Sequence, residues 1–192
     1  MNKKNCIIVH GCPSHVESNP NKRSYDKHWM PWIKKELSTR GISTFIPLMP
    51  EPWKPDYNSW KKKFEKNEIN ANTILIGHSC GCAFLVRWLG ETSCYADKLI
   101  LVAPWKIADK KSKTEKEFYD YPIKDSVKYQ VNEVVIFTAD NESADGKKSA
   151  KIFQRFLGGR LIELKGRGHY IFWDMKTEQF PELLDVILNE NI

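Results

Sequence analysis

Short apolar runs alternate with longer amphipathic segments along most of this chain. Six of the runs have the length and the residue types of buried strands. They cover residues 6–10, 43–46, 73–76, 98–102, 133–138 and 160–164. Several are apolar at every position, which is typical of strands that are covered on both faces of a sheet.

The segments between these runs carry apolar residues at helical spacing. In the first of them, Trp29, Ile33 and Leu37 recur so that one helix face is buried. Helices are predicted at residues 28–40, 57–67, 81–91, 146–157 and 178–189. This alternation indicates the α/β class, a three-layer α/β/α sandwich in which a parallel sheet carries helices on both faces.

Two segments interrupt the pattern. Residues 47–55 contain too many prolines for a helix or a strand, so they are predicted to form a fixed loop and a pocket wall beyond a strand end. Residues 105–129 are polar and then aromatic, which fits either a small lid or cap or an ordinary surface insertion. Otherwise residues 1–192 are predicted to form a single domain.

The net charge of +6 changes this picture little. Lysines cluster at residues 61–63 and 110–116, but acidic residues are interleaved with them, so solvated surface is favoured over a nucleic-acid site. No apolar run approaches the ~18 residues of a membrane span. Because residues 1–5 lead directly into a strand, no cleavable signal is expected either. We therefore expect neither a nucleic-acid nor a membrane partner.

The chain has five cysteines, an odd number. A reduced, cytoplasmic protein is the simplest interpretation. His10, Cys12 and His15 crowd one loop, but no paired ligand motif accompanies them elsewhere, so no metal and no cofactor are expected.

The candidate chemistry centres on Gly77-His78-Ser79-Cys80-Gly81. This sequence follows the apolar run at 73–76 and precedes the predicted helix at 81–91. A G-x-S-x-G motif between a strand and a helix is the nucleophile elbow, in which a sharp turn lifts the serine off the sheet edge. Ser79 is therefore the predicted nucleophile.

A serine hydroxyl needs a base, and the base needs a carboxylate to orient it. His169 follows the last predicted strand, while His78 is adjacent to the serine and is expected to point elsewhere. Asp140 lies directly past the fifth strand and is the preferred acid, with Glu142 and Asp145 as alternatives. Serine, acid and histidine then follow one another in the chain order of this fold.

A developing oxyanion needs two hydrogen-bond donors. One is expected from the backbone N–H of Cys80, the residue after the nucleophile, while the side chain of Cys80 is expected to be incidental. The other is expected from the loop after the first strand, from Gly11 or Cys12.

At these residues the chain resembles the small serine hydrolases related to retinoblastoma-binding protein 9 and the bacterial YdeN-type proteins. The resemblance rests on residues 7–11, 29–37, 47–50, 76–81 and 168–169. It implies a compact α/β-hydrolase fold with sheet order 2-1-3-4-5-6. It also implies a triad of Ser79, His169 and Asp140, although this chain has Ala144 where the family pattern has a proline.

The resemblance further implies that the chain hydrolyses a small-molecule ester as a carboxylesterase-like enzyme, through an acyl-enzyme. Because the family name records partner binding, the alternative is a protein-interaction module on a hydrolase fold.

Overall fold

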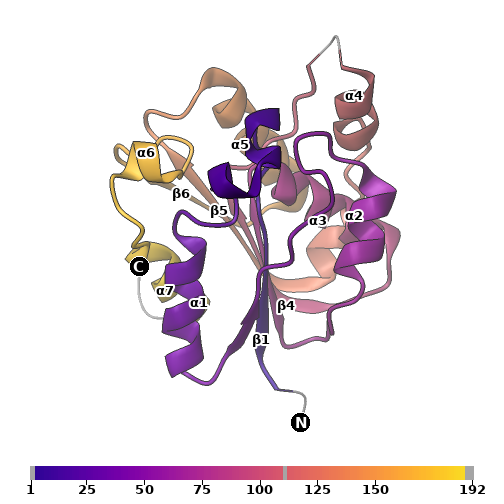
Figure 1. Cartoon of the computed structure of the whole chain (residues 1–192). Helices are drawn as coiled ribbons and strands as arrows, with labels where there is room; N and C mark the ends of the chain where they lie inside the picture. Colours follow the sequence, from indigo (N-terminus) through magenta and orange to yellow (C-terminus); the bar gives the residue numbers. More distant parts are fainter. Residues whose placement is uncertain (1–2, 110–111, 189–192) are drawn as a thin grey trace.

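A computed structural model describes residues 3–109 and 112–188 of the chain (Figure 1). Six strands form one parallel sheet in the order β2-β1-β3-β4-β5-β6. The strands are β1 (Asn5–Val9), β2 (Ser43–Phe45), β3 (Thr73–His78), β4 (Ala96–Val102), β5 (Val131–Ala139) and β6 (Arg160–Leu164). The predicted α/β class and sheet order are confirmed.

Five of the helices correspond to those predicted from apolar spacing. They are α1 (Met30–Thr39), α2 (Tyr57–Phe64), α3 (Cys80–Glu91), α5 (Ala144–Leu157) and α7 (Pro181–Leu188). The start of α5 is fixed by Ser143, whose side chain accepts a hydrogen bond from the N–H of Gly146. The predicted end of the last helix, Asn189, lies outside the described residues.

The remaining helical elements are short and lie in loops. They are α4 (Lys113–Tyr119), α6 (Phe172–Met175) and the 3₁₀ helices η1 (His15–Ser18), η2 (Pro20–Lys22) and η3 (Asp125–Tyr129).

Each face of the sheet has its own hydrophobic core. Ile7 and Val9 point to the face covered by α2, α3 and α5, whereas Cys6 and Ile8 point to the face covered by α1 and α7. Because side chains alternate along a strand, covering both faces buries every residue of β1 and β3. This explains the continuous apolar runs of the sequence.

The described parts of the segment at 105–129 pack onto the first of these cores. It contains α4 and η3, and Phe118, Tyr119 and Val127 are buried there. The proline-rich loop is also anchored, since the indole N–H of Trp60 donates to the carbonyl of Pro50 at 2.9 Å. Both segments begin beyond the carboxyl end of a strand, the first after β4 and the second after β2.

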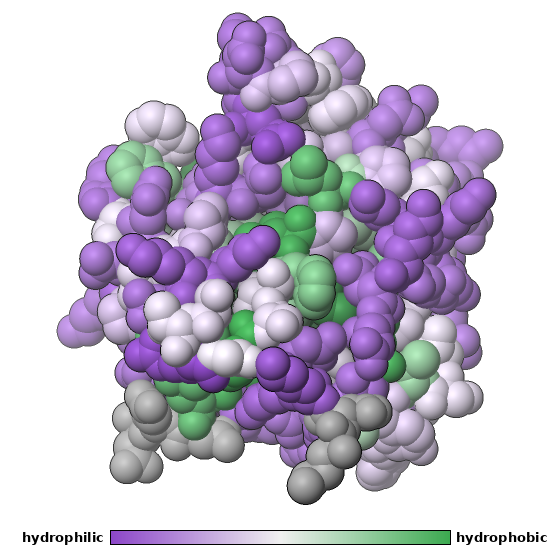
Figure 2. Space-filling model, turned by 60° about the horizontal axis from the view of Figure 1, so that its bottom comes forward, coloured by the Kyte–Doolittle hydropathy of each residue, from purple (hydrophilic) through white to green (hydrophobic). Residues whose placement is uncertain are grey.

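The face at the lower end of Figure 1 is mostly hydrophilic. Turned so that the lower end of Figure 1 comes forward, the molecule shows only small green areas between polar side chains (Figure 2). The lysine run of α2 lies on the side away from its buried face, and Lys61 pairs with Glu91 at 3.9 Å. In the other run, residues 110–111 lie outside the described residues. Across 3–109 and 112–188, no helix is long and apolar enough to cross a bilayer.

Candidate active site

Ser79 occupies a sharp turn between β3 and α3. Its φ of +53° and ψ of −120° are unusual for a residue with a side chain. A Cβ on Gly77 would lie 2.7 Å from Cα of Cys82, and one on Gly81 would lie 2.4 Å from the carbonyl oxygen of Val9. Glycine is therefore required on both sides of the turn, as the elbow motif predicts.

Hydrogen bonds hold this strained backbone in place. The N–H of Ser79 donates to the carbonyl of Val102 at 3.0 Å, and its own carbonyl accepts from the N–H of Trp105 at 3.2 Å. Such strain persists where the surroundings fix it, and it commonly marks a functional site. The strand β4 and the loop behind it thus present the Ser79 hydroxyl at the sheet edge.

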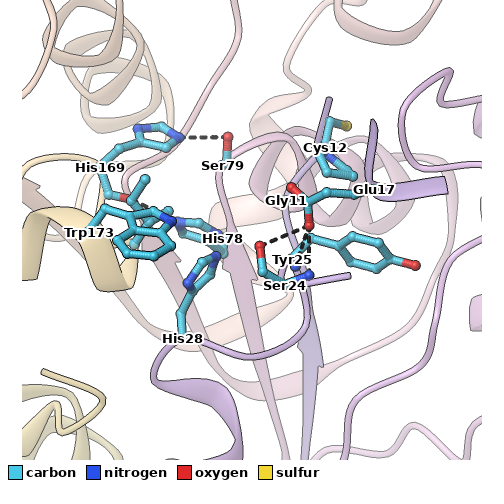
Figure 3. Close-up of a pocket in the computed structure, with 12 residues that line it drawn as sticks. Gly11, Cys12, Glu17, Ser24, Tyr25, His28, His78, Ser79, His169 and Trp173 are labelled. Carbon is cyan, nitrogen blue, oxygen red and sulfur yellow. Dashed lines mark hydrogen bonds between the residues drawn. The ribbon is translucent and has the colours of Figure 1, made fainter. Parts of the chain in front are cut away.

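Ser79, His169 and Glu142 form a chain of hydrogen bonds. The Nε2 atom of His169 lies 2.9 Å from Oγ of Ser79, and its Nδ1 atom lies 2.7 Å from Oε2 of Glu142. A carboxylate only accepts, so Nδ1 carries the proton and Nε2 is free to accept from the serine. Figure 3 shows the His169 ring pointing at Ser79 across the cavity mouth.

The Glu142 carboxyl is enclosed, with its side chain 3% exposed. Burial by itself raises the pKa of this carboxyl, but the hydrogen bond and charge of His169 and the N–H of Ser143 outweigh it. The net result is a lowered pKa for Glu142. A charged carboxylate therefore faces the imidazole.

The prediction that Asp140 contacts the histidine is wrong. Asp140 directly follows β5, its N–H donates to the carbonyl of Leu164 at 3.1 Å, and its carboxylate accepts from the N–H of Gly166 at 2.7 Å. The chain then turns, with the N–H of Glu142 donating to the carbonyl of Ala139 at 3.2 Å. This turn carries Glu142, with its longer side chain, back to His169. Asp145, the third candidate, lies in the first turn of α5.

The loop that carries His169 is tied down by side chains from three elements. The N–H of Gly168 donates to Asn141 at 2.8 Å, and the N–H of His169 donates to Asp174 of α6 at 2.8 Å. His78 donates from Nε2 to the carbonyl of His169 at 2.9 Å. The expectation that His78 points elsewhere missed this contact, because no sequence pattern links β3 to the loop after β6.

Both proposed oxyanion donors lie beside Ser79. Within the described part of the chain, the backbone N–H groups of Cys80 and Cys12 donate to no protein acceptor. Gly11 also lies close, since a Cβ built on it would be 3.1 Å from Cβ of Ser79. The loop after β1 thus lies against Ser79.

Cys12 and Cys80 are joined by a disulfide. This overturns two expectations, that all five cysteines are reduced and that the Cys80 side chain is incidental. The other three, Cys6, Cys82 and Cys94, are free. Two cysteines 68 positions apart pair because β1 and β3 are neighbours, which brings the loop after β1 against the start of α3.

His10 anchors the loop after β1 from within the core. It is fully buried, its Nδ1 donates to the carbonyl of Gly11 at 2.8 Å, and its Nε2 accepts from the N–H of Met49 at 3.0 Å. Burial lowers the pKa of His10 to about 4, against smaller raising effects of the Gly11 carbonyl and nearby acids. His10 is therefore neutral and joins the loop after β1 to the proline-rich loop.

We expect this histidine to make the fold sensitive to acid. An unfolded chain takes up a proton at His10 below its ordinary pKa of 6.5, whereas the folded chain does so only near 4. Stability is therefore lost as pH falls through that window, by about 3 kcal/mol from His10. Urea unfolding of wild type and His10→Gln at pH 7.5 and pH 4.5 measures this loss.

Glutamine keeps one donor and one acceptor but does not titrate, so the variant should lose less stability on acidification. Burial also lowers the pKa of His78, so part of the slope should remain. Equal losses in wild type and variant would contradict the prediction.

Two cavities meet at Ser79 and His169. One, of about 240 Å³, is bounded by the loop after β1 and by Tyr25, His28 and Trp173 (Figure 3). The other, of about 340 Å³, is bounded by the proline-rich loop and the segment at 105–129. Its aromatic walls are Trp53, Trp105 and Tyr119. The proline-rich loop therefore forms a pocket wall, as its sequence predicts.

Within residues 3–109 and 112–188, no cluster of three or more histidine, cysteine or acidic side chains is arranged to hold a metal ion. The loop that crowds His10, Cys12 and His15 uses the first two in the contacts described above.

A family model described as "Serine hydrolase" matches residues 19–189 of this chain. The chain is 32% identical to YdeN of Bacillus subtilis (strain 168) over 88 residues, which span 45% of this chain and 42% of YdeN. It is 25% identical to the serine hydrolase RBBP9 of Rattus norvegicus over 165 residues, spanning 83% of this chain and 84% of that one.

Solved structures show the same fold. The crystal structure of the ydeN gene product from B. subtilis matches with a TM-score of 0.83 and 22% identity, covering 98% of both chains. Est1E from Butyrivibrio proteoclasticus with bound ferulic acid matches with a TM-score of 0.67 and 13% identity, covering 98% of this chain and 88% of that chain.

Proposed function

The chain belongs to the serine hydrolase family, and from that premise we propose that it hydrolyses small neutral carboxylic esters. The observation that carries the proposal is the hydrogen-bonded chain from Ser79 through His169 to Glu142, built on a strained elbow. An alkoxide-forming nucleophile, a base and an orienting carboxylate are the three parts that acyl transfer needs.

In this mechanism His169 accepts the Ser79 proton at Nε2 as Oγ attacks the ester carbonyl carbon. The charged Glu142 holds Nδ1–H and stabilises the imidazolium that forms. His169 then gives the proton to the leaving alcohol, which leaves an acyl-enzyme on Ser79. A water molecule, deprotonated by the same histidine, releases the acid and restores the serine.

The oxyanion of each tetrahedral intermediate is stabilised by the N–H groups of Cys80 and Cys12. Both are free of protein acceptors in the described residues and flank Ser79. The start of α3 adds the favourable end of a helix dipole to this site.

The cavities suit the two halves of a small ester. Their linings contain the carboxylates of Glu17 and Glu115, but neither lysine nor arginine among the described residues. Burial lowers the pKa of His28 and His78, so these histidines add no positive charge at neutral pH. A substrate with an anionic acyl or alcohol group would meet no countercharge, which favours neutral esters. We propose that the segment at 105–129 acts as a small cap over the second cavity.

A fluorophosphonate probe and a panel of p-nitrophenyl esters test this function. We expect stoichiometric labelling at Ser79, hydrolysis of the acetate and butyrate, and weaker hydrolysis of the negatively charged hemisuccinate. Absence of both labelling and hydrolysis would leave the alternative of an interaction module on a hydrolase fold.

We also propose a cytoplasmic location, because three of the five cysteines are free. The Cys12–Cys80 disulfide would then be exposed to cellular thiols.

A further inference from the structure

The Cys12–Cys80 disulfide joins the two backbone segments that carry the proposed oxyanion donors. Cys80 is the first residue of α3 and directly follows the nucleophile, while Cys12 lies in the loop after β1. Their Cα atoms are 5.7 Å apart. The covalent link therefore holds together the two segments that lie beside Ser79.

We propose that this disulfide is a thiol-exchange site that controls the esterase activity. This inference rests on the ester hydrolysis proposed above. In the oxidised form the disulfide fixes the oxyanion hole and the enzyme is active. A small dithiol reductant, or two equivalents of a monothiol, opens the bridge and lowers the activity. Reoxidation restores it.

The two sulfur atoms differ in access. Cys80 is completely buried, whereas Cys12 is half-buried and lines both cavities at Ser79. A thiol small enough to enter either cavity therefore reaches Sγ of Cys12 first. Figure 3 shows the Cys12 side chain at the cavity wall near Ser79.

The exchange follows from this geometry. A thiolate of the reductant attacks Sγ of Cys12, the S–S bond breaks, and Cys80 leaves as a thiolate. The first turn of α3 stabilises that anion, because helix N-terminal N–H groups favour a thiolate. The second reductant thiol then displaces the sulfur of Cys12. Two electrons and two protons pass to the protein, and the reductant becomes its own disulfide.

Opening the disulfide affects the backbone N–H donors of Cys80 and Cys12 differently. Cys80 stays in place, because it belongs to α3 and the neighbouring Gly81 packs against the carbonyl of Val9. Cys12 lies in no helix or strand, and its backbone makes no hydrogen bond to other described residues. Once the bridge opens, Cys12 keeps only a 4.0 Å contact of its Sγ with the hydroxyl of Tyr119 among the described residues, and the nearest backbone anchor is the contact of His10 with the Gly11 carbonyl. Reduction therefore loosens the Cys12 donor and leaves the triad intact.

The test compares kcat for p-nitrophenyl butyrate in the oxidised and the dithiothreitol-reduced protein. Alkylation under denaturing conditions and intact mass should count three thiols before reduction and five after it. We expect reduction to lower kcat by about 10- to 100-fold, less than the 10²- to 10³-fold cost of deleting a donor. Removal of the reductant and reoxidation should restore it.

Cys12→Ala keeps the backbone N–H but cannot form the bridge. We expect its kcat to match that of reduced wild type and to be insensitive to dithiothreitol. Cys94→Ser is the matched control: it removes a free thiol that precedes β4, at the opposite end of the strands from Ser79. This variant should respond to reduction as wild type does.

Far-UV circular dichroism of the reduced protein separates the proposed control from a structural role. A reduced protein that keeps its fold and loses activity supports the proposal. A reduced protein that unfolds, or one whose kcat is unchanged or raised, overturns it. If the oxidised protein hydrolyses no ester and Ser79 is not labelled, the proposed function fails as well, whereas an active oxidised enzyme indifferent to reduction removes the thiol control alone.

Discussion

Replacement of Ser79 by alanine should abolish ester hydrolysis while the fold survives. In the proposed mechanism its hydroxyl oxygen forms the acyl-enzyme, and loss of such a nucleophile lowers kcat by roughly 10⁴-fold or more. Among the residues that the structure describes, Oγ makes one hydrogen bond, to His169. The backbone bonds of Ser79 to Val102 and Trp105 do not depend on it. Steady-state hydrolysis of p-nitrophenyl butyrate and fluorophosphonate labelling measure the loss.

The strained backbone at Ser79 provides an internal comparison. Ser79→Gly removes the hydroxyl too, but glycine adopts a φ of +53° without the cost that alanine bears. Both variants should be inactive, and Ser79→Gly should unfold at a higher temperature than Ser79→Ala. Esterase activity that persists in purified Ser79→Ala would assign hydrolysis to another residue.

The second large effect concerns the acid. Glu142→Gln should lower kcat by about 10³- to 10⁴-fold, comparable to loss of the orienting carboxylate in a serine protease. The glutamine carbonyl oxygen can still accept from the N–H of Ser143, so its NH₂ group faces His169. The imidazole must then accept at Nδ1 and carry its proton on Nε2. In that tautomer it cannot take the proton from Ser79.

Asp140→Asn is the matched comparison, because it neutralises the neighbouring carboxyl that the sequence favours. Asparagine retains an oxygen for the N–H of Gly166, so kcat should change by less than about 10-fold. The ratio of the two kcat values, measured on the same ester at the same pH, decides between the acids. A larger loss in Asp140→Asn than in Glu142→Gln would restore the acid predicted from the sequence.

Much of this architecture follows from local patterns in the sequence. Continuous apolar runs and helical spacing depend only on which faces are buried, so they locate the strands and five helices to within a few residues. The elbow is also indicated by a short local motif, in which Gly77 is required by the start of the following helix, whereas Gly81 is required by the carbonyl groups of Val9 and His10 on the neighbouring strand β1 and just after it. Ser79 and His169 follow from their places after strand ends, where the parallel sheet gathers side chains at one edge.

The details that set the proposed chemistry depend on contacts between distant segments. The choice of Glu142 over Asp140 rests on a turn after β5 that sends one carboxylate toward β6 and the next toward His169. Asp140 and Glu142 are only two residues apart, and their places in the sequence do not indicate which carboxylate points to His169. The contact of His78 with the His169 loop likewise joins residues 91 positions apart.

The disulfide is the clearest example of a contact between distant segments that the sequence does not indicate. An odd number of cysteines, spread along the chain, indicates free thiols when only composition is considered. The parallel pairing of β1 with β3 then brings two strand ends together, and with them Cys12 and Cys80. The sequence by itself thus determined the strands, the elbow and its serine, because local patterns of burial and a five-residue motif indicate them. Only the tertiary structure decided which carboxylate contacts His169, how the loop of His169 is anchored, and that Cys12 pairs with Cys80, because each depends on which loops the packed strands bring side by side.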